Sequence, residues 1–198
     1  MLYRVRSIKI RILLQHQKRK INKKIMKKLL AITLFTTILT GSAVFAQTDK
    51  SKRVSPPATV SETLKNGTVV TINYSQPSLK NRVIGKDIAT FGKVWRTGAN
   101  EATVFEVSKD VTINGKLLPA GKYSFYSIPG EKEWTFMFNK TWDQWGTVYS
   151  QEQDQLRITA KPETTESAKE QLTFKVAKTG EVSLEWGKTE IDFELKEK

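Results

Sequence analysis

The nine residues from Trp95 to Thr103, WRTGANEAT, are denser in polar chemistry than the residues on either side of them. They combine an indole, a guanidinium, an amide, a carboxylate and two hydroxyls around one glycine. Arg96 could bind a carboxylate or phosphate through two parallel hydrogen bonds. Trp95 could stack on a sugar or another ring, while Asn100 and Glu101 set its orientation. The alternative is a structural cluster, in which Arg96 pairs with Glu101 and Trp95 closes one end of the fold. In either case we expect Arg96 and Glu101 to lie close together, because a buried guanidinium without a carboxylate is costly.

A second polar and aromatic segment runs from Asn139 to Gly146 and contains Trp142 and Trp145. Two indoles three residues apart on a loop could form a stacking platform or a folded-in hydrophobic corner. Glu101 is the one candidate catalytic residue, as an acid or base, and no metal ligands are predicted. The candidate ligand-binding residues are Arg82, Trp95, Arg96, Thr97, Asn100, Glu101, Trp142 and Trp145.

Composition excludes several kinds of chemistry. The sequence has no cysteine, and its one histidine is His16, in the N-terminal leader. The segment that follows the leader therefore has no Ser-His-Asp or Cys-His catalysis, no zinc site with thiolate or imidazole ligands and no disulfide. Catalysis would need Asp, Glu, Lys, Arg, Tyr, Ser or Thr, or a hard cation bound by oxygens. No cofactor is predicted.

The formal net charge of +13 belongs almost entirely to the N-terminal leader. Residues 1–46 contain 11 of the 33 Lys and Arg and none of the 20 Asp and Glu, so residues 47–198 carry a net charge of only +2. The charge of the folded part therefore does not predict a nucleic-acid partner.

The leader has the pattern of a helical secretory signal peptide over residues 26–46. Met26-Lys27-Lys28 is a short basic start, the run from Leu29 to Leu39 is apolar, and Val44-Phe45-Ala46 has the small residues of a cleavage site. The apolar run is shorter than the ~20 residues that a membrane span needs. We therefore expect cleavage before Gln47, a periplasmic or secreted protein and no stable membrane anchor, and we interpret residues 1–25 as a start site assigned too early. The alternatives are an uncleaved anchor and an extended basic leader.

The remaining sequence predicts an all-β fold. Residues 47–57 are a polar, proline-ending lead-in that we expect to be flexible, and residues 58–198 are expected to form one domain. Alternating apolar residues predict about nine or ten strands in an antiparallel β-sandwich or flattened barrel. The best candidate for a helix, Glu163 to Gln171, is short. The residues expected in the core are Trp134, Phe136, Phe174, Leu184, Trp186 and Phe193.

Turn signals divide these strands. Asn66-Gly67 and Asn114-Gly115 predict tight hairpins. Thr179-Gly180 and Gly187-Lys188 predict the two turns of a C-terminal meander of three strands. The longest irregular stretch, from about Gln76 to Asn100, ends in the WRTGANEAT segment, and long loops on a rigid sandwich are where binding sites usually lie.

Four motifs of the sequence, considered together, carry a resemblance: YSQPSLKNRVIG, FGKVWRTGANEAT, INGKLLPAGKYSFYSIPG and WTFMFNK. They resemble the uncharacterised bacterial family known as domain of unknown function 2911, and the similarity extends over about residues 55–195. The resemblance implies a secreted or periplasmic β-rich domain and no particular reaction. This chain has Lys80-Asn81-Arg82 where the family usually has Lys-Gly-Arg. Since Asn tolerates a positive φ, we expect the turn to be kept.

Three functions are compatible with these observations. The leading hypothesis is an exported domain that binds a small polar ligand, such as a carbohydrate, or a partner in the cell envelope through the WRTGANEAT segment. The second is a hydrolase or isomerase with carboxylate acid–base chemistry at Glu101, assisted by Arg96. The third is a structural module of the envelope.

Overall fold

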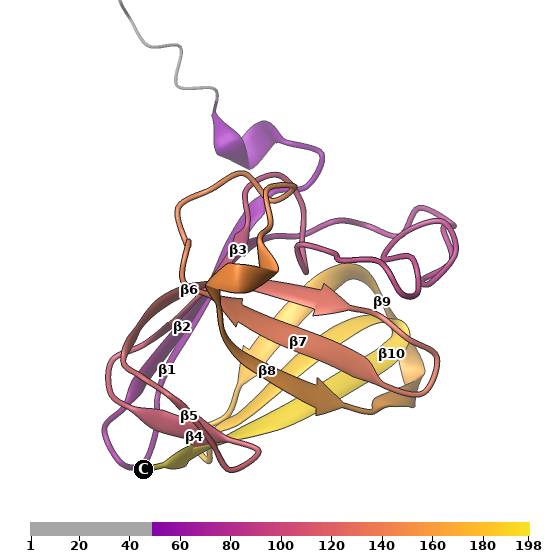
Figure 1. Cartoon of the computed structure of the whole chain (residues 1–198). Coiled ribbons are helices and arrows are strands. Elements are labelled where there is room, and N and C mark those ends of the chain that lie inside the picture. Colours follow the sequence, from indigo (N-terminus) through magenta and orange to yellow (C-terminus); the bar gives the residue numbers. More distant parts are fainter. Residues whose placement is uncertain (1–48) are drawn as a thin grey trace, which may run out of the picture. The chain divides into compact units, whose positions relative to one another are not determined.

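The computed structural model describes residues 49–198, which form one compact unit. The predicted signal peptide lies outside the described residues. Ten strands form two antiparallel sheets that do not close into a barrel, which confirms the predicted β-sandwich (Figure 1). In spatial order, the larger sheet contains β1 (Pro57–Thr63), β2 (Val69–Ser75), β3 (Thr103–Val107), β6 (Gly121–Ile128), β7 (Trp134–Asn139) and β8 (Asp154–Ala160). The smaller sheet contains β5 (Lys116–Leu118), β4 (Val111–Ile113), β10 (Glu181–Glu197) and β9 (Pro162–Val176). Two short 3-10 helices, η1 (Lys50–Lys52) and η2 (Gln151–Gln153), complete the elements.

The core lies between the two sheets and is rich in aromatic rings. The six residues expected there are all buried, which confirms the strand alternation on which the prediction depended. Phe125 lies at the centre, with ring centroids 5.6, 5.1 and 5.0 Å from those of Phe105, Phe136 and Phe138. Such ring pairs contribute about 0.5–1.5 kcal/mol each beyond the area they bury, so the domain reaches stability without a disulfide.

Three of the four predicted turns are confirmed. Asn114 and Gly115 have φ values of 52° and 73°, as a type I′ hairpin turn requires, and they connect β4 to β5. Gly67 connects β1 to β2 with a φ of 77°, and Gly180 connects β9 to β10. Asn81, where the family pattern has Gly, takes a φ of 61°, so the expected substitution of Asn for Gly in a left-handed turn is also confirmed.

The predicted turn at Gly187 is wrong. Gly187 lies inside β10, which continues to Glu197, so the expected three-strand meander is a pair of long strands. The pairing with β9 shifts register on both sides of Gly187, whose φ is 61°. A positive φ serves a bulge as well as a turn, and the sequence alone does not distinguish the two. The bulge lets one strand bend where a turn would have ended it.

The segment from Glu163 to Gln171, the best helix candidate, is part of β9. On one side it pairs with β10, through Thr164 opposite Thr189 and Lys169 opposite Gly187. On the other side the amide of Leu79 donates to the carbonyl of Glu170. These tertiary hydrogen bonds outweigh a weak helical pattern, because local propensity is only a weak preference.

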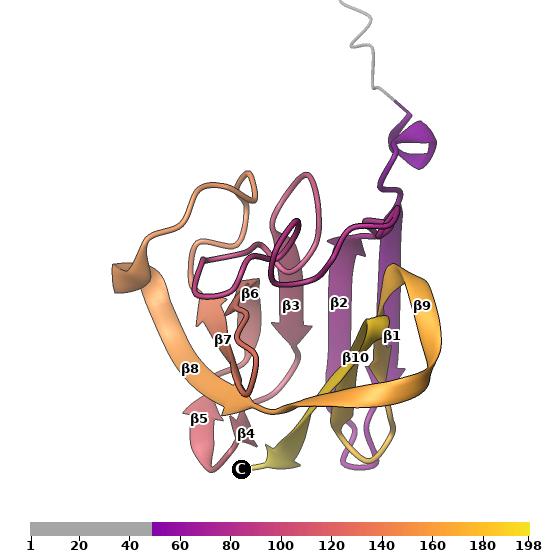
Figure 2. The same ribbon diagram turned by 90° about the vertical axis from the view of Figure 1, so that its right-hand side faces the viewer.

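The long connections meet at one end of the sandwich. The loop of residues 76–102 between β2 and β3 and the loop of residues 140–153 between β7 and β8 lie together, with η1 nearby (Figures 1 and 2). The C terminus and the β4–β5 hairpin lie at the opposite end. The second loop also covers the outer face of the larger sheet, which explains why Met137 and Asn139 are buried although they point away from the main core.

Candidate ligand-binding site

The structure joins the two segments that the sequence singled out. The amide of Ala102 donates to the carbonyl of Gln144 at 3.1 Å, and the amide of Gly146 donates to the carbonyl of Asn100 at 3.2 Å. Glu101 and Trp145 form an antiparallel bridge between these two bonds. The WRTGANEAT segment and the loop of residues 140–153 therefore form one structural unit, although about 40 residues separate them in the sequence.

The backbone of WRTGANEAT is strained. Thr97 has a φ of 49° and its side chain is fully buried. A β-branched residue is an outlier in the left-handed region, and such strain persists only where the surroundings hold it. Two hydrogen bonds do so here: the Thr97 hydroxyl donates to that of Ser127 at 3.0 Å, and the Thr103 hydroxyl donates to the carbonyl of Thr97 at 2.9 Å. These two hydrogen bonds therefore fix the backbone next to Arg96.

Trp95 belongs partly to the core. Its backbone exchanges two hydrogen bonds with Ser127, of 2.7 and 2.8 Å. Its ring stacks on Trp186, with centroids 5.4 Å apart and planes 7° apart, and meets the edge of Trp134 at 6.1 Å. One face of the indole is therefore already used within the protein, and the rest of this half-buried ring borders the surface next to Arg96.

Arg96 has no carboxylate partner within residues 49–198. None of the ion pairs in this part of the chain includes its guanidinium, and its Nε atom is buried without a hydrogen bond. The aliphatic part of the side chain packs on Gly146, which has no room for a side chain at that position. Because a guanidinium has five N–H donors and normally uses them, Arg96 retains its capacity to bind an anion.

The expected ion pair between Arg96 and Glu101 is wrong. Glu101 instead binds Arg53 at 2.7 Å and Lys50 at 3.1 Å, so its partners come from the N-terminal segment that precedes β1. The amide side chain of Asn100 holds the same segment by donating to the carbonyl of Ser55 at 3.1 Å. These cations are about 50 residues away in the sequence, and the turn after Arg96 directs Glu101 towards them.

The partners of Glu101 also determine its charge. The hydrogen bond from Arg53, with a smaller effect of Lys50, lowers the pKa of the Glu101 carboxyl to about 2. A general acid needs the opposite, a pKa raised towards neutrality. The environment of Glu101 therefore does not favour the hydrolase or isomerase hypothesis, which relied on this carboxyl.

This pKa predicts a stability effect that depends on pH. Because the carboxyl has a lower pKa in the folded state than in the unfolded state, its ion pairs stabilise the fold above pH 4.5, and this contribution is lost as the pH falls towards 2. At pH 7, Glu101→Gln should lower Tm by at most about 4 °C, because partly exposed ion pairs contribute little to stability. Thermal unfolding from pH 7 to pH 2.5 should show the wild-type and variant curves converging. Glu131→Gln, at an exposed position, should match the wild type throughout, and a Glu101→Gln difference that persists at pH 2.5 would contradict the assignment.

The pocket beside Arg96 has a volume of about 320 Å³. It lies between the two loops and the outer face of β6. The residues that line it are Val94, Trp95, Arg96, Tyr126, Gly146, Thr147 and Tyr149. Arg96 is the one charged residue among them, and no carboxylate lines the pocket.

A hydrogen-bond network holds Tyr126 in the pocket wall. Its hydroxyl donates to the carbonyl of Val148 and accepts from the side-chain amide of Gln144 at 3.0 Å. Burial raises the pKa of Tyr126, and hydrogen bonds from Gln144 and Ser124, together with the charge of Arg96, offset part of this effect. The hydroxyl is therefore neutral at physiological pH and lies within the field of the guanidinium.

Tyr149 is fixed by a second network behind the pocket. Its hydroxyl donates to Asp154 at 2.6 Å and accepts from Arg157 at 2.6 Å, while Arg157 also binds Asp154 at 2.7 Å. Burial, followed by the neighbouring Asp154, raises the pKa of Tyr149 to about 12. Arg157 thus has a carboxylate partner in Asp154, in contrast to Arg96.

The other predicted site residues lie outside this pocket. Arg82 donates to the carbonyls of Leu79 and Ser78 in its own loop, at 2.9 and 2.6 Å. Trp142 is 41% exposed and carries the ammonium of Lys122 over its ring at 5.1 Å, and Trp145 is 51% exposed. Of the predicted site residues, the fold joins the stretch from Trp95 to Glu101 to Trp145. Arg82 and Trp142 make their contacts elsewhere.

Sequence reasoning predicted Trp95 and Arg96 but missed the other residues that line the pocket, including its two tyrosines, Tyr126 and Tyr149. The alternation in β6 places Tyr126 opposite the core-facing Phe125, and this was a usable signal. The pattern gave no reason to connect that face with the WRTGANEAT segment. Tyr149 follows the Trp142–Trp145 loop without any distinctive spacing.

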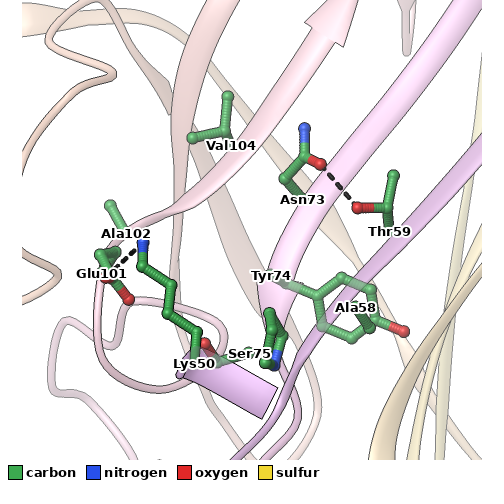
Figure 3. Close-up of a pocket in the computed structure, with 10 residues that line it drawn as sticks. Lys50, Ala58, Thr59, Asn73, Tyr74, Ser75, Glu101, Ala102 and Val104 are labelled. Atoms are coloured by element: carbon green, nitrogen blue, oxygen red, sulfur yellow. Dashed lines mark hydrogen bonds and ion pairs between the residues drawn. The ribbon is translucent and has the colours of Figure 1, made fainter. Parts of the chain in front are cut away.

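A second pocket, of about 200 Å³, lies where the N-terminal segment crosses β1, β2 and β3 (Figure 3). Lys50 and Glu101 line it and bind each other, while Thr59 donates to Asn73 at 2.8 Å on its opposite side. Its principal charged and polar groups are thus already paired. The pocket beside Arg96 is therefore the stronger candidate for a ligand site, because the guanidinium of Arg96 is not paired with a carboxylate within residues 49–198.

Comparison with known proteins identifies a family. Neither the curated proteins nor the solved structures contain a match to this chain. The family model described as "Protein of unknown function (DUF2911)" matches residues 55–195, which include both loops, β1 to β9 and all of β10 except its last two residues. The match spans well over half of the sequence and confirms the resemblance that the motifs indicated. The chain therefore belongs to the DUF2911 family.

Proposed function

We propose that this protein binds a small organic anion in the pocket between its two loops, with Arg96 as the anion-binding residue. The observation that carries the proposal is the guanidinium of Arg96, which lacks a carboxylate partner within residues 49–198 and borders a pocket. The predicted leader would deliver this domain to the periplasm or to the outside of the cell, where small anions or acidic envelope components would be its ligands.

The energetics of charge burial support this role. Withdrawing a cation from water without a partner is expensive, and folded proteins normally supply a carboxylate. Two carboxylates of the neighbouring segments, Glu101 and Asp154, are already bound to Arg53 and Arg157. A bound carboxylate or phosphate would pair with Arg96 in the way that Glu101 pairs with Arg53 and Asp154 pairs with Arg157.

The local backbone supports it as well. Strained residues gather at ligand sites, because a stable surrounding structure can hold a side chain in a position that relaxed backbone would not give. Thr97, with its φ of 49°, directly follows Arg96, and its strain is maintained by Ser127 and Thr103. A purely structural cluster would be expected to satisfy Arg96 internally.

The test is ligand-dependent thermal unfolding of residues 47–198. A panel of organic acids, acidic sugars and nucleotides is added to the wild type and to Arg96→Gln. A ligand at 100 times its Kd stabilises the native state by about 2.7 kcal/mol, which corresponds to a rise in Tm of about 5–10 °C for a domain of this size. Arg96→Gln should abolish this rise and leave the Tm of the ligand-free protein nearly unchanged.

The matched control is Arg82→Gln. This arginine is exposed and binds only carbonyls of its own loop, so the variant should respond to ligand as the wild type does. The proposal fails if no anion raises the Tm of the wild type, or if Arg96→Gln keeps the full rise. A large fall in the Tm of ligand-free Arg96→Gln, with no ligand response in the wild type, would favour the structural module instead.

A further inference from the structure

The charge of the pocket beside Arg96 defines the class of anion that it can accept. Arg96 is the one cation that lines it, and Arg157, which contacts the pocket residue Tyr149, is also bound to Asp154. The field in the pocket therefore comes from one positive charge. A ligand with one negative charge neutralises it, whereas a second negative charge would be buried without a partner, which is costly.

The hydrogen-bond donors of the pocket indicate the same class of ligand, an anion with one negative charge. The hydroxyl hydrogens of Tyr126 and Tyr149 are already donated, to the carbonyl of Val148 and to Asp154. These tyrosines can only accept further hydrogen bonds, so they offer nothing to a third anionic oxygen. The guanidinium has a planar fork that matches the two oxygens of a carboxylate. A phosphate monoester has three strong acceptor oxygens and a charge of about −1.5 to −2 at pH 7, whereas the side chains that line this pocket offer no second cation to it.

Most of the remaining wall of the pocket is apolar. Val94, the exposed part of Trp95 and the rings of Tyr126 and Tyr149 line the pocket around the guanidinium. Val94 and Val148 are 44% and 56% exposed at the adjoining surface. A flat or apolar body attached to the carboxylate would cover these groups, since burying apolar surface is favourable.

We propose that the pocket selects monocarboxylates with a flat or apolar body over phosphate monoesters. This inference rests on the proposed function, because it assumes that Arg96 binds an anion. It goes further in naming the charge and the shape of the ligand, which follow from one unpaired guanidinium among aromatic walls.

The experiment compares three probes of nearly equal shape by isothermal titration and thermal shift. Benzoate carries one charge, phenyl phosphate carries nearly two, and benzamide carries none. The wild type should bind benzoate at least tenfold more tightly than phenyl phosphate and should not respond measurably to benzamide. Arg96→Gln should lose the response to benzoate.

A second variant tests the reason for this preference. Thr147 is exposed and lines the pocket, so Thr147→Lys adds a second cation without disturbing the core. This variant should bind phenyl phosphate more tightly than the wild type does and should reduce the preference for benzoate at least fivefold. Thr147→Gln, of similar length and without charge, should keep the wild-type preference.

The possible failures are distinct. If phenyl phosphate binds the wild type as well as benzoate does, and both need Arg96, the class assignment is wrong while anion binding stands. If benzamide binds as well as benzoate, the charge of the ligand is irrelevant and both proposals fail. If benzoate does not bind while another anion of the panel binds through Arg96, only the present inference is overturned. If no anion binds, the proposed function fails with it.

Discussion

Trp186→Ala is expected to lower the free energy of unfolding by about 3–5 kcal/mol, close to the whole stability of many domains. Trp186 is fully buried, stacks on Trp95, and donates from its indole nitrogen to the carbonyl of Glu170 at 3.3 Å. Removing the ring leaves a cavity between the two sheets and also withdraws the support of Trp95. Urea denaturation followed by circular dichroism measures the loss.

The matched control is Trp145→Ala. Trp145 is 51% exposed, so its removal should change stability by about 0.5 kcal/mol or less. If the two variants lost similar stability, the division of the tryptophans into core and surface would be wrong. Where Trp186→Ala still folds, its ligand response should also be weakened, because Trp95 forms one wall of the pocket.

Gly146→Ala is expected to disrupt the site from the opposite side. A Cβ atom at this position would collide with Cδ of Arg96 and lie 2.8 Å from the carbonyl oxygen of Asn100. Either the arginine must leave its position or the two loops must separate. We expect a stability loss of about 1–3 kcal/mol, typical of overpacking, together with loss of the Tm rise that anions produce in the wild type.

Gly92→Ala separates these two effects. Gly92 has a φ of 71° and open space around its Cβ position, so alanine there should cost about 1–2 kcal/mol from backbone strain and leave the ligand response intact. If Gly92→Ala and Gly146→Ala lose similar stability but only Gly146→Ala loses the ligand response, Gly146 acts on the site itself. A Gly146→Ala protein that responds fully to anions would contradict the position assigned to Arg96.

The strands were predictable because their signal is local. The alternation in WTFMFN places Trp134, Phe136 and Phe138 on one face by the geometry of an extended chain, and all three are buried. Asn114-Gly115 predicted a hairpin for a similar reason, since both residues tolerate the positive φ of a type I′ turn. Gly187 shows where this reasoning ends. A glycine with positive φ suits a turn or a bulge, and only the continued pairing of β10 with β9 decides between them.

For the site, the sequence by itself determined the types of group, and the tertiary structure decided which of them are paired. WRTGANEAT could be identified from its composition, and so could the absence of cysteine and of histidine after the leader. Local spacing suggested that Arg96 pairs with Glu101, whereas the fold brings Arg53 and Lys50 to Glu101 and leaves Arg96 beside a pocket. Ion pairs form between the charges that the packed segments bring within about 4 Å, and in this protein the relevant segments, the N-terminal one and the two loops, come from three separate parts of the chain.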